Sequence, residues 1–157
     1  MEYEEAMVPE EYANDGKVKS ALAESGIVSE LWRYEILDFA DRFADAGGDT
    51  HVYLWKVPST NGSMYKSAVH AVELANVFNN LEDEMSAGEV YPATAAKVQE
   101  SWVNFAKAGE PSVEDAAWKA YNTDTRDTMV IEKDAWECVS DPSKVARKLL
   151  EKAYGDE

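Results

Sequence analysis

This sequence holds few of the residues on which metal centres and disulfide-stabilised folds depend. Its 157 residues include one cysteine, Cys138, and two histidines, His51 and His70. A single thiol excludes an internal disulfide and a cysteine-based metal cluster. The two histidines lie far apart in the sequence and outside any HExxH pattern, which excludes a histidine-rich metal site. We therefore expect no bound metal.

The phosphate-binding and nucleophile motifs of common enzymes are missing as well. None of the eight glycines belongs to a G-x-x-x-x-G-K-[ST] loop or to a G-x-G-x-x-G turn, which cradle nucleotide phosphates. None is placed to form the G-x-S-x-G elbow that exposes a catalytic serine at a strand-to-helix turn. We expect no cofactor, and the sequence contains no recognisable serine nucleophile.

Positive charge and long apolar runs are scarce. Fifteen Lys and Arg residues stand against 31 Asp and Glu residues, which gives a formal charge of −16. Nucleic-acid phosphates and anionic membrane surfaces would repel such a chain, so we expect neither as a partner. No apolar run approaches the roughly 18 residues of a membrane span, and the acidic start MEYEEAMVPEEY lacks the features of a secretory signal. Together with the single thiol, these features favour a cytoplasmic location.

What remains is a chain of ordinary apolar content whose periodicity predicts more helix than strand. We expect a short helix over 15–25 that Gly26 ends, and a second helix from an N-cap at Ser29 to the Gly47-Gly48 pair. Two shorter helices should follow His70 and Pro92, the latter ending at Gly109. The last helix should begin with Asp141 as N-cap and Pro142 at the first helical position, and should end at Gly155.

Three segments have the composition of strands, namely residues 52–57, 128–131 and 136–139. Since strand 52–57 needs hydrogen-bonding neighbours, and only the hairpin of the other two can supply them, we expect a small sheet of about three strands. The fold class is therefore α/β and rich in helix. We expect a single domain overall, in which an acidic helical segment, 1–28, precedes the main part, 29–157.

The large aromatic residues on the apolar stripes and in the first strand should be mostly buried. Any that are exposed together would mark a surface for a partner or for self-association. The residues expected in this core are Trp32, Phe39, Phe43, Tyr53, Trp55, Phe78, Trp102 and Phe105.

Few residues are candidates for chemistry. Cys138 falls in a predicted strand, where a buried, inert thiol is the common case, and His51 should be a surface or edge residue. His70 follows a polar loop and precedes a helix, which is a common place for catalytic side chains. Position alone favours a structural histidine over a catalytic base. Glu73, three residues on, fits a first-turn acid that reaches back to the helix N-terminus.

Four blocks of the sequence nevertheless resemble the type-B carboxylesterases, the family of para-nitrobenzyl esterases and cholinesterases. The segment SAVHAVELANVFNN, 67–80, is similar to the segment of that family that holds its catalytic histidine, with His70, Glu73, Leu74, Val77, Phe78 and Asn80 in matching order. SWVNFAKAGEPS, 101–112, resembles W-x-x-F-A-K-T-G-x-P-N, and WKAYNTDTRDTMVI, 118–131, resembles W-P-x-Y and the final strand. The segment LWRYEILDFADRFADAGGDTHVYLWKV, upstream of the histidine, resembles the preceding helix and strand.

The resemblance spans about 29–139 and implies the C-terminal portion of an α/β-hydrolase. His70 would then be the triad histidine, which deprotonates a serine and later protonates the leaving alcohol. The serine and the acid precede the histidine in this fold, and the sequence before His70 contains neither a nucleophile elbow nor an oxyanion-hole glycine loop. The sequence also departs from the family at Ala71 and Ser67, where glycine is usual.

Two functions follow from this resemblance. In the first, the chain is part of a carboxylesterase and hydrolyses a small ester only when a missing N-terminal part supplies the serine, the acid and the oxyanion hole. The partner would then be an N-terminal esterase chain, or a second copy through self-association. In the second, it is a truncated stand-alone domain that catalyses nothing and has a binding or structural role. The isolated chain is expected to be inactive in either case, because the nucleophile and the oxyanion donors are absent.

Overall fold

The computed structural model describes residues 16–58, 68, 70–80 and 91–154, apart from the side chains of residues 16–25 and Ile27. The predicted loops over 59–67 and 81–90, the acidic start of the chain and Gly155 lie outside these residues. The described chain divides into two compact units. One contains the residues up to Ala46 together with those from Pro142 onward, and the other is Gly47–Asp141.

The first unit contains one long helix where the sequence predicted two. Helix α2 spans Gly16–Asp45 without a break, so the predicted stop at Gly26 and the N-cap at Ser29 are wrong. Gly26 ends a helix only when it takes a left-handed backbone, and the described glycines with positive φ are Gly47 and Gly109. Inside a helix a glycine costs only about 1 kcal/mol relative to alanine, which the good helix formers around it offset.

The second helix of this unit, α5, spans Lys144–Tyr154 and packs on α2. Ser143 and Glu30 join the two helices, with 3.5 Å between the hydroxyl and a carboxylate oxygen. Burial raises the pKa of Glu30, and the charge of Arg33 and the Ser143 hydrogen bond oppose that rise. The prediction that α5 begins at Asp141 and Pro142 is wrong by two residues. Asp141 instead donates its amide to the Arg126 carbonyl at 3.1 Å and has φ 47°, which an N-cap does not adopt.

Helix α2 carries an exposed apolar stripe, which we call the α2 stripe, formed by Val28, Trp32, Ile36, Phe39 and Phe43. Trp32 is 68% exposed and Phe39 70% exposed, and the Phe39 and Phe43 rings stack with 6.1 Å between their centroids. The predicted burial of Trp32, Phe39 and Phe43 is therefore wrong. Periodicity locates an apolar helix face but does not say whether this chain itself covers it.

The second unit is built on a three-stranded sheet in the order β1-β2-β3, with β1 at Val52–Trp55, β2 at Asp127–Ile131 and β3 at Trp136–Ser140. β1 pairs in parallel with β2, opposing Val52 to Thr128, and β2 pairs in antiparallel fashion with β3, opposing Val130 to Glu137. The predicted sheet of three strands is confirmed, although β1 ends two residues before the expected Val57.

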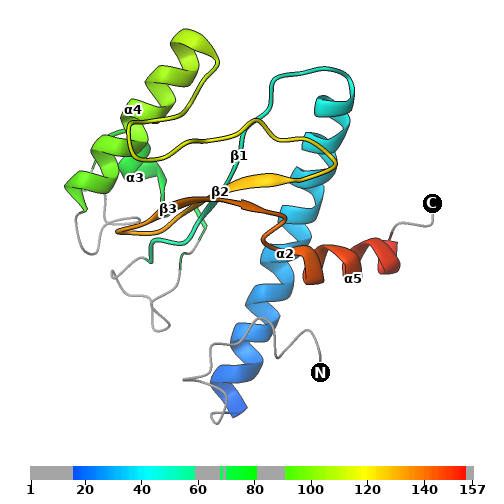
Figure 1. Ribbon diagram of the computed structural model, residues 1–157. Coiled ribbons are helices and arrows are strands. Elements are labelled where there is room, and N and C mark those ends of the chain that lie inside the picture. Colours follow the sequence, from blue (N-terminus) through cyan, green and yellow to red (C-terminus); the bar gives the residue numbers. More distant parts are fainter. Residues whose placement is uncertain (1–15, 59–67, 69, 81–90, 155–157) are drawn as a thin grey trace. The chain divides into compact units, whose positions relative to one another are not determined.

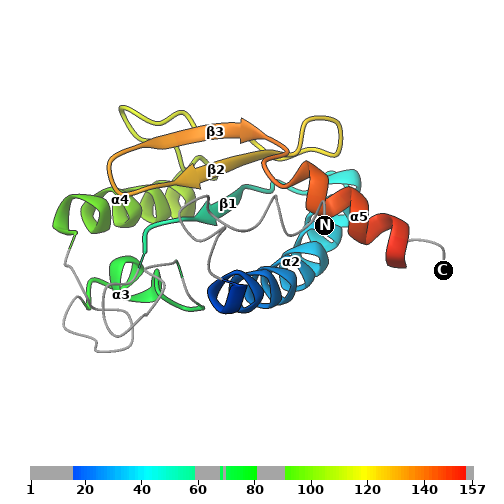
Figure 2. The same cartoon turned by 90° about the horizontal axis from the view of Figure 1, so that it is seen from below.

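Helix α4, Pro92–Ala108, lies against one face of this sheet, and the short helix α3, Leu74–Val77, packs on α4 (Figures 1 and 2). Pro92 at the first position and Gly109 with φ 75° bound α4 as predicted. The core between helix and sheet contains Val57, Ala116, Trp118, Met129 and Ile131. Of the aromatic residues expected in the core of this unit, Phe78 is 74% and Phe105 43% exposed, while Tyr53, Trp55 and Trp102 are half-buried.

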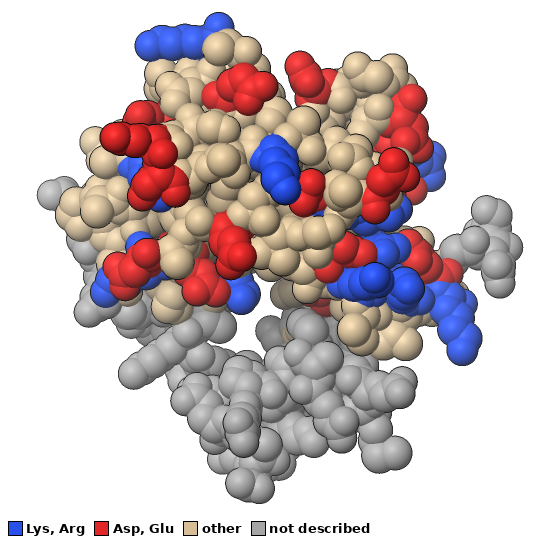
Figure 3. All heavy atoms as spheres, viewed as in Figure 1, with Lys and Arg blue, Asp and Glu red and all other residues tan. Residues whose placement is uncertain are grey.

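The acidic side chains are spread over the surface. On the face seen in Figure 3, Asp and Glu alternate with Lys and Arg and with uncharged residues. Several charges are paired, for example Lys97 with Asp115 at 2.8 Å and Lys56 with Glu132 at 3.1 Å. Among the helices that the structure describes, none is both long and apolar enough to cross a lipid bilayer.

Candidate functional site

His70 lies in the turn that leads from the β1 side of the second unit into α3. Its side chain is exposed, and no described residue forms a hydrogen bond or ion pair with its ring. Neither a serine hydroxyl nor a carboxylate of the described chain flanks the imidazole. The predicted exposed position at a helix start is confirmed, whereas the catalytic role of His70 stays a prediction.

The residue after His70 has an unusual backbone. Ala71 has φ 64°, in the left-handed region that favours glycine, and its carbonyl accepts the Leu74 amide at 3.2 Å. A left-handed residue other than glycine costs roughly 1–2 kcal/mol because its Cβ approaches the following carbonyl oxygen. This conformation gives a physical reason for glycine beside the histidine, and in this chain alanine carries the strain.

Glu73 holds this turn to the sheet. The expectation that its carboxylate reaches back to the helix N-terminus is wrong, because Glu73 makes no capping hydrogen bond at the start of α3. Its carboxylate instead accepts a hydrogen bond from the Tyr53 hydroxyl on β1. Burial of the phenol, then the negative charge of Glu73 and this hydrogen bond, raise the pKa of Tyr53 from 10.0 to about 12.

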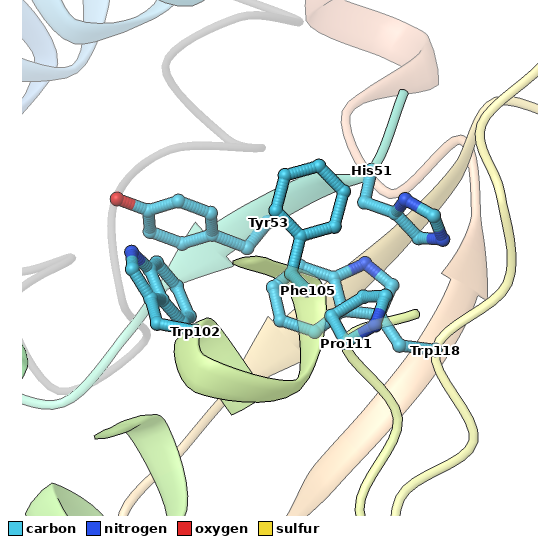
Figure 4. Close-up of a pocket in the computed structure, with 6 residues that line it drawn as sticks. All are labelled: His51, Tyr53, Trp102, Phe105, Pro111 and Trp118. Carbon is cyan, nitrogen blue, oxygen red and sulfur yellow. The ribbon is translucent and has the colours of Figure 1, made fainter. Parts of the chain in front are cut away.

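An aromatic hollow lies beside β1, between the strand and α4. His51, Tyr53, Trp102, Phe105, Pro111 and Trp118 line a partly open space of about 180 Å³ (Figure 4). The rings meet edge to face, with 5.2 Å between the centroids of Tyr53 and Trp102 and 6.2 Å between those of Tyr53 and Trp118. Such contacts stabilise the packing beyond the area that the rings bury.

His51 directly precedes β1, at an edge of the described sheet as predicted, but its half-buried ring belongs to this aromatic cluster and not to the open surface. Its ring packs on Phe105 at 5.6 Å and on Trp118 at 6.3 Å between centroids. Neither ring nitrogen of His51 has a hydrogen-bond partner among the described residues. Burial lowers the pKa of His51, although the charges of Glu110 and Asp49 oppose that shift. The sequence did contain a signal for this position. His51 and Tyr53 are two residues apart, and side chains two apart along a strand lie on the same face.

The remaining candidate, Cys138, is a free, half-buried thiol in β3 that packs against the edge of the core, as its predicted place in a strand implied. Across the part of the chain that the structure describes, no three His, Cys, Asp or Glu side chains are grouped so that they could hold a metal ion. The hollow and the His70 turn therefore offer one exposed imidazole, one carboxylate and an aromatic wall. An imidazole in that setting can transfer protons, and no hydroxyl or thiol nucleophile of the described residues lies beside it.

Comparison with known proteins gives these features a context. Residues 4–153 match the model of the carboxylesterase family. Over 97 residues the chain is 33% identical to the para-nitrobenzyl esterase of Bacillus subtilis, a match that covers 59% of this chain and 20% of that protein. The chain thus spans about a fifth of the length of this relative.

Solved esterase structures agree with the family match. A thermophilic para-nitrobenzyl esterase is 28% identical with a TM-score of 0.59, covering 66% of this chain and 22% of the other. An esterase of Clostridium hathewayi, described as hydrolysing aliphatic aromatic polyesters, aligns with 97% of this chain and 30% of its own at a TM-score of 0.71, but at 18% identity it supports the fold alone. The fold is accordingly a portion of the α/β-hydrolase fold, and the chain belongs to the carboxylesterase family.

Proposed function

We propose that this chain is the part of a carboxylesterase that carries the triad histidine, His70, and that it hydrolyses small esters only when the rest of the enzyme is joined to it. The observation that carries the proposal is the agreement between the family match over 4–153 and the place of His70. His70 lies in the segment that resembles the family's histidine motif, on an exposed turn, and no described residue forms a hydrogen bond or ion pair with its ring.

In this proposal the whole enzyme uses ordinary acyl-transfer chemistry. The rest of the enzyme contributes a serine, an acid and the oxyanion donors. The His70 imidazole accepts the serine proton as the serine oxygen attacks the ester carbonyl, and it returns that proton to the departing alcohol. The acid would bind the other ring nitrogen and fix the tautomer. This chain's own contribution is to place His70, through the turn that Ala71 shapes and Glu73 ties to Tyr53.

The exposure of the α2 stripe supports the view that another part of the enzyme covers it and that this chain is not an autonomous domain. Five apolar side chains at helical spacing, Val28, Trp32, Ile36, Phe39 and Phe43, are 44–70% exposed. Exposed apolar patches on soluble proteins commonly mark interfaces. An amino-terminal esterase portion is a better occupant than a second copy, because two chains of charge −16 repel one another.

A complementation assay tests the proposal. The partner is the Bacillus subtilis para-nitrobenzyl esterase without the segment that aligns with this chain, and the substrate is a p-nitrophenyl ester. We expect each chain alone to be inactive and the mixture to show saturable turnover that His70→Gln abolishes. His51→Gln serves as the matched control, since it changes the chain's other histidine away from the reacting groups. A mixture that binds but stays inactive would favour the non-catalytic binding or structural role.

A further inference from the structure

The aromatic hollow beside β1 has a wall that hydrogen bonds hold in place. Its lining residues come from β1 and the residue before it, from α4 and from the connection after α4, all within the unit Gly47–Asp141. The Ser101 hydroxyl donates to the Pro111 carbonyl, and the Ser112 hydroxyl accepts the Trp118 amide at 2.9 Å. A wall fixed in this way loses little conformational freedom when a ligand enters, so the hollow is preorganised for binding.

The hollow has room for one aromatic ring. Its free space is about 180 Å³, and an apolar cavity of about 150 Å³ is enough to hold a benzene molecule. Protein interiors rarely leave a space of this size unfilled, because the atoms that line it lose van der Waals contacts. A ligand ring of matching size would restore those contacts.

The polar atoms of the wall are engaged or buried. The Tyr53 hydroxyl donates to the Glu73 carboxylate. Both ring nitrogens of His51 and the indole nitrogen of Trp118 are buried and have no hydrogen-bond partner among the described residues. The hollow therefore presents mainly ring carbon and the apolar ring of Pro111 (Figure 4). Water finds few partners in such a space, so its replacement by an apolar molecule is favourable.

The charges around the hollow favour an uncharged ligand. The carboxylates of Glu110 and Asp49 favour a positive charge on His51, but burial outweighs them and lowers the pKa of His51. The surroundings of His51 thus disfavour a cation even with two acids nearby. The same two carboxylates repel an anion. A neutral molecule avoids both penalties.

The arrangement of the rings favours an aromatic ligand over an aliphatic one. The lining rings meet edge to face, with interplanar angles of 71° between Tyr53 and Trp102 and 71° between His51 and Phe105. The positive edge of one aromatic ring is attracted to the negative face of another, and an aromatic ligand can continue this pattern. A saturated ring of the same size offers only its apolar surface.

We propose that the aromatic hollow is a binding site for a neutral molecule with a single aromatic ring. A polar substituent on the ligand would lie at the open side of the hollow, where water solvates it. His70 is not among the residues that line the hollow, so this inference does not depend on the proposed function.

Titration of the chain with benzyl alcohol tests the proposal through the indole N–H signals of its five tryptophans in an NMR spectrum. Trp102 and Trp118 line the hollow, so their signals should shift together and saturate in the millimolar range, as expected for a ligand of few atoms. Trp32 lies on the exposed α2 stripe and reports unspecific apolar binding. Its signal should shift less and should not saturate.

Three molecules of similar size test the parts of the proposal separately. Cyclohexylmethanol lacks the aromatic ring and should bind about threefold more weakly or less. Benzoate and benzylammonium carry opposite charges, and each should bind about tenfold more weakly or less than benzyl alcohol. Equal binding of cyclohexylmethanol, or binding of either ion as tight as that of benzyl alcohol, would overturn the proposal.

A pair of phenylalanine variants locates the site. Phe105→Ala removes part of the wall at a residue that is already 43% exposed, and it should weaken benzyl alcohol binding about fivefold or more. Phe78→Ala is the matched control, because Phe78 is 74% exposed and does not line the hollow, and it should leave binding unchanged. Equal binding by both variants, no saturable shift, or a Trp32 signal that follows the same curve as Trp102 would contradict the proposal. If Phe105→Ala fails to fold, the comparison of the four molecules on the wild type decides the question.

Discussion

Replacing Tyr53 with phenylalanine should loosen the His70 turn while leaving the aromatic cluster in place. The variant keeps the ring that packs on Trp102 and Trp118 and removes the hydroxyl that donates to the Glu73 carboxylate. A hydrogen bond to a charged group contributes about 1.5–3 kcal/mol to stability. Since Tyr53 is only half-buried, solvent screens part of this, and we expect a loss of about 1–2 kcal/mol.

Burial of the phenol, together with the charge of Glu73 and this hydrogen bond, gives the protein a specific response to alkali. The folded state holds the Tyr53 proton more tightly than the unfolded chain does, since its pKa is about 12 against 10.0. The corresponding stability is complete below pH 10.0 and is lost as the pH rises through about 12. Two units of pKa correspond to roughly 2.7 kcal/mol, which solvent screening again reduces to about 1–2 kcal/mol.

Urea unfolding of the wild type, Tyr53→Phe, Glu73→Ala and the double variant measures this contribution. At neutral pH we expect a coupling energy of about 1–2 kcal/mol between the two side chains. Above pH 10.0 the wild type should lose stability relative to Tyr53→Phe, so that the two curves converge. Additive single substitutions, or a stability difference that does not change with pH, would refute the reasoning.

Three further predictions concern the backbone, His51 and the α2 stripe. Ala71 (φ 64°) and Gly109 (φ 75°) both have a left-handed backbone, which favours glycine. Ala71→Gly should therefore raise the free energy of unfolding by about 0.5–1 kcal/mol, and Gly109→Ala should lower it by a similar amount. Denaturant titration measures both changes. The lowered pKa of His51 means that the unfolded chain binds the proton more tightly than the folded protein does. Stability should therefore fall as the pH drops below the ordinary histidine pKa of 6.5, and His51→Phe should weaken that fall. Phe39→Gln and Ile36→Gln should leave the thermal midpoint of the isolated chain within about 1–2 °C but weaken its binding to the esterase partner, as calorimetric titration would show.

Much of the second unit could be predicted from local sequence signals. Pro92 and Gly109 mark the ends of α4 because one presets a helical φ and the other accepts a left-handed one. The three strands followed from their composition and from the need to satisfy the backbone of β1. The position of His70 between a polar loop and a helix predicted an exposed turn, where the structure finds it.

The predictions that were wrong depend on contacts that one sequence does not encode locally. A glycine such as Gly26 is compatible with both a helix end and a helix interior, and in the structure it lies in the interior of α2. Asp141 and Pro142 have the chemistry of a helix start, but the Arg126 carbonyl holds the Asp141 amide beside the sheet. The Tyr53–Glu73 hydrogen bond joins residues of two elements that no local pattern connects.

The exposure of the α2 stripe has a different origin. Trp32 and Phe39 have the spacing of core residues, and apolar periodicity does not distinguish a face buried within a chain from a face buried by another chain. The same ambiguity applies to β1, whose composition fits an interior strand although it lies at an edge of the described sheet. Both features agree with a chain that spans about a fifth of its curated relative.

The ratio of kcat/KM between wild type and His70→Gln, in the complex with the truncated Bacillus subtilis para-nitrobenzyl esterase, tests the central claim most directly. If His70 is the triad histidine, p-nitrophenyl ester hydrolysis should fall by a factor on the order of 10⁴ or more while binding of the two chains is unchanged. A complex that hydrolyses the ester equally well with glutamine at position 70 would contradict the account.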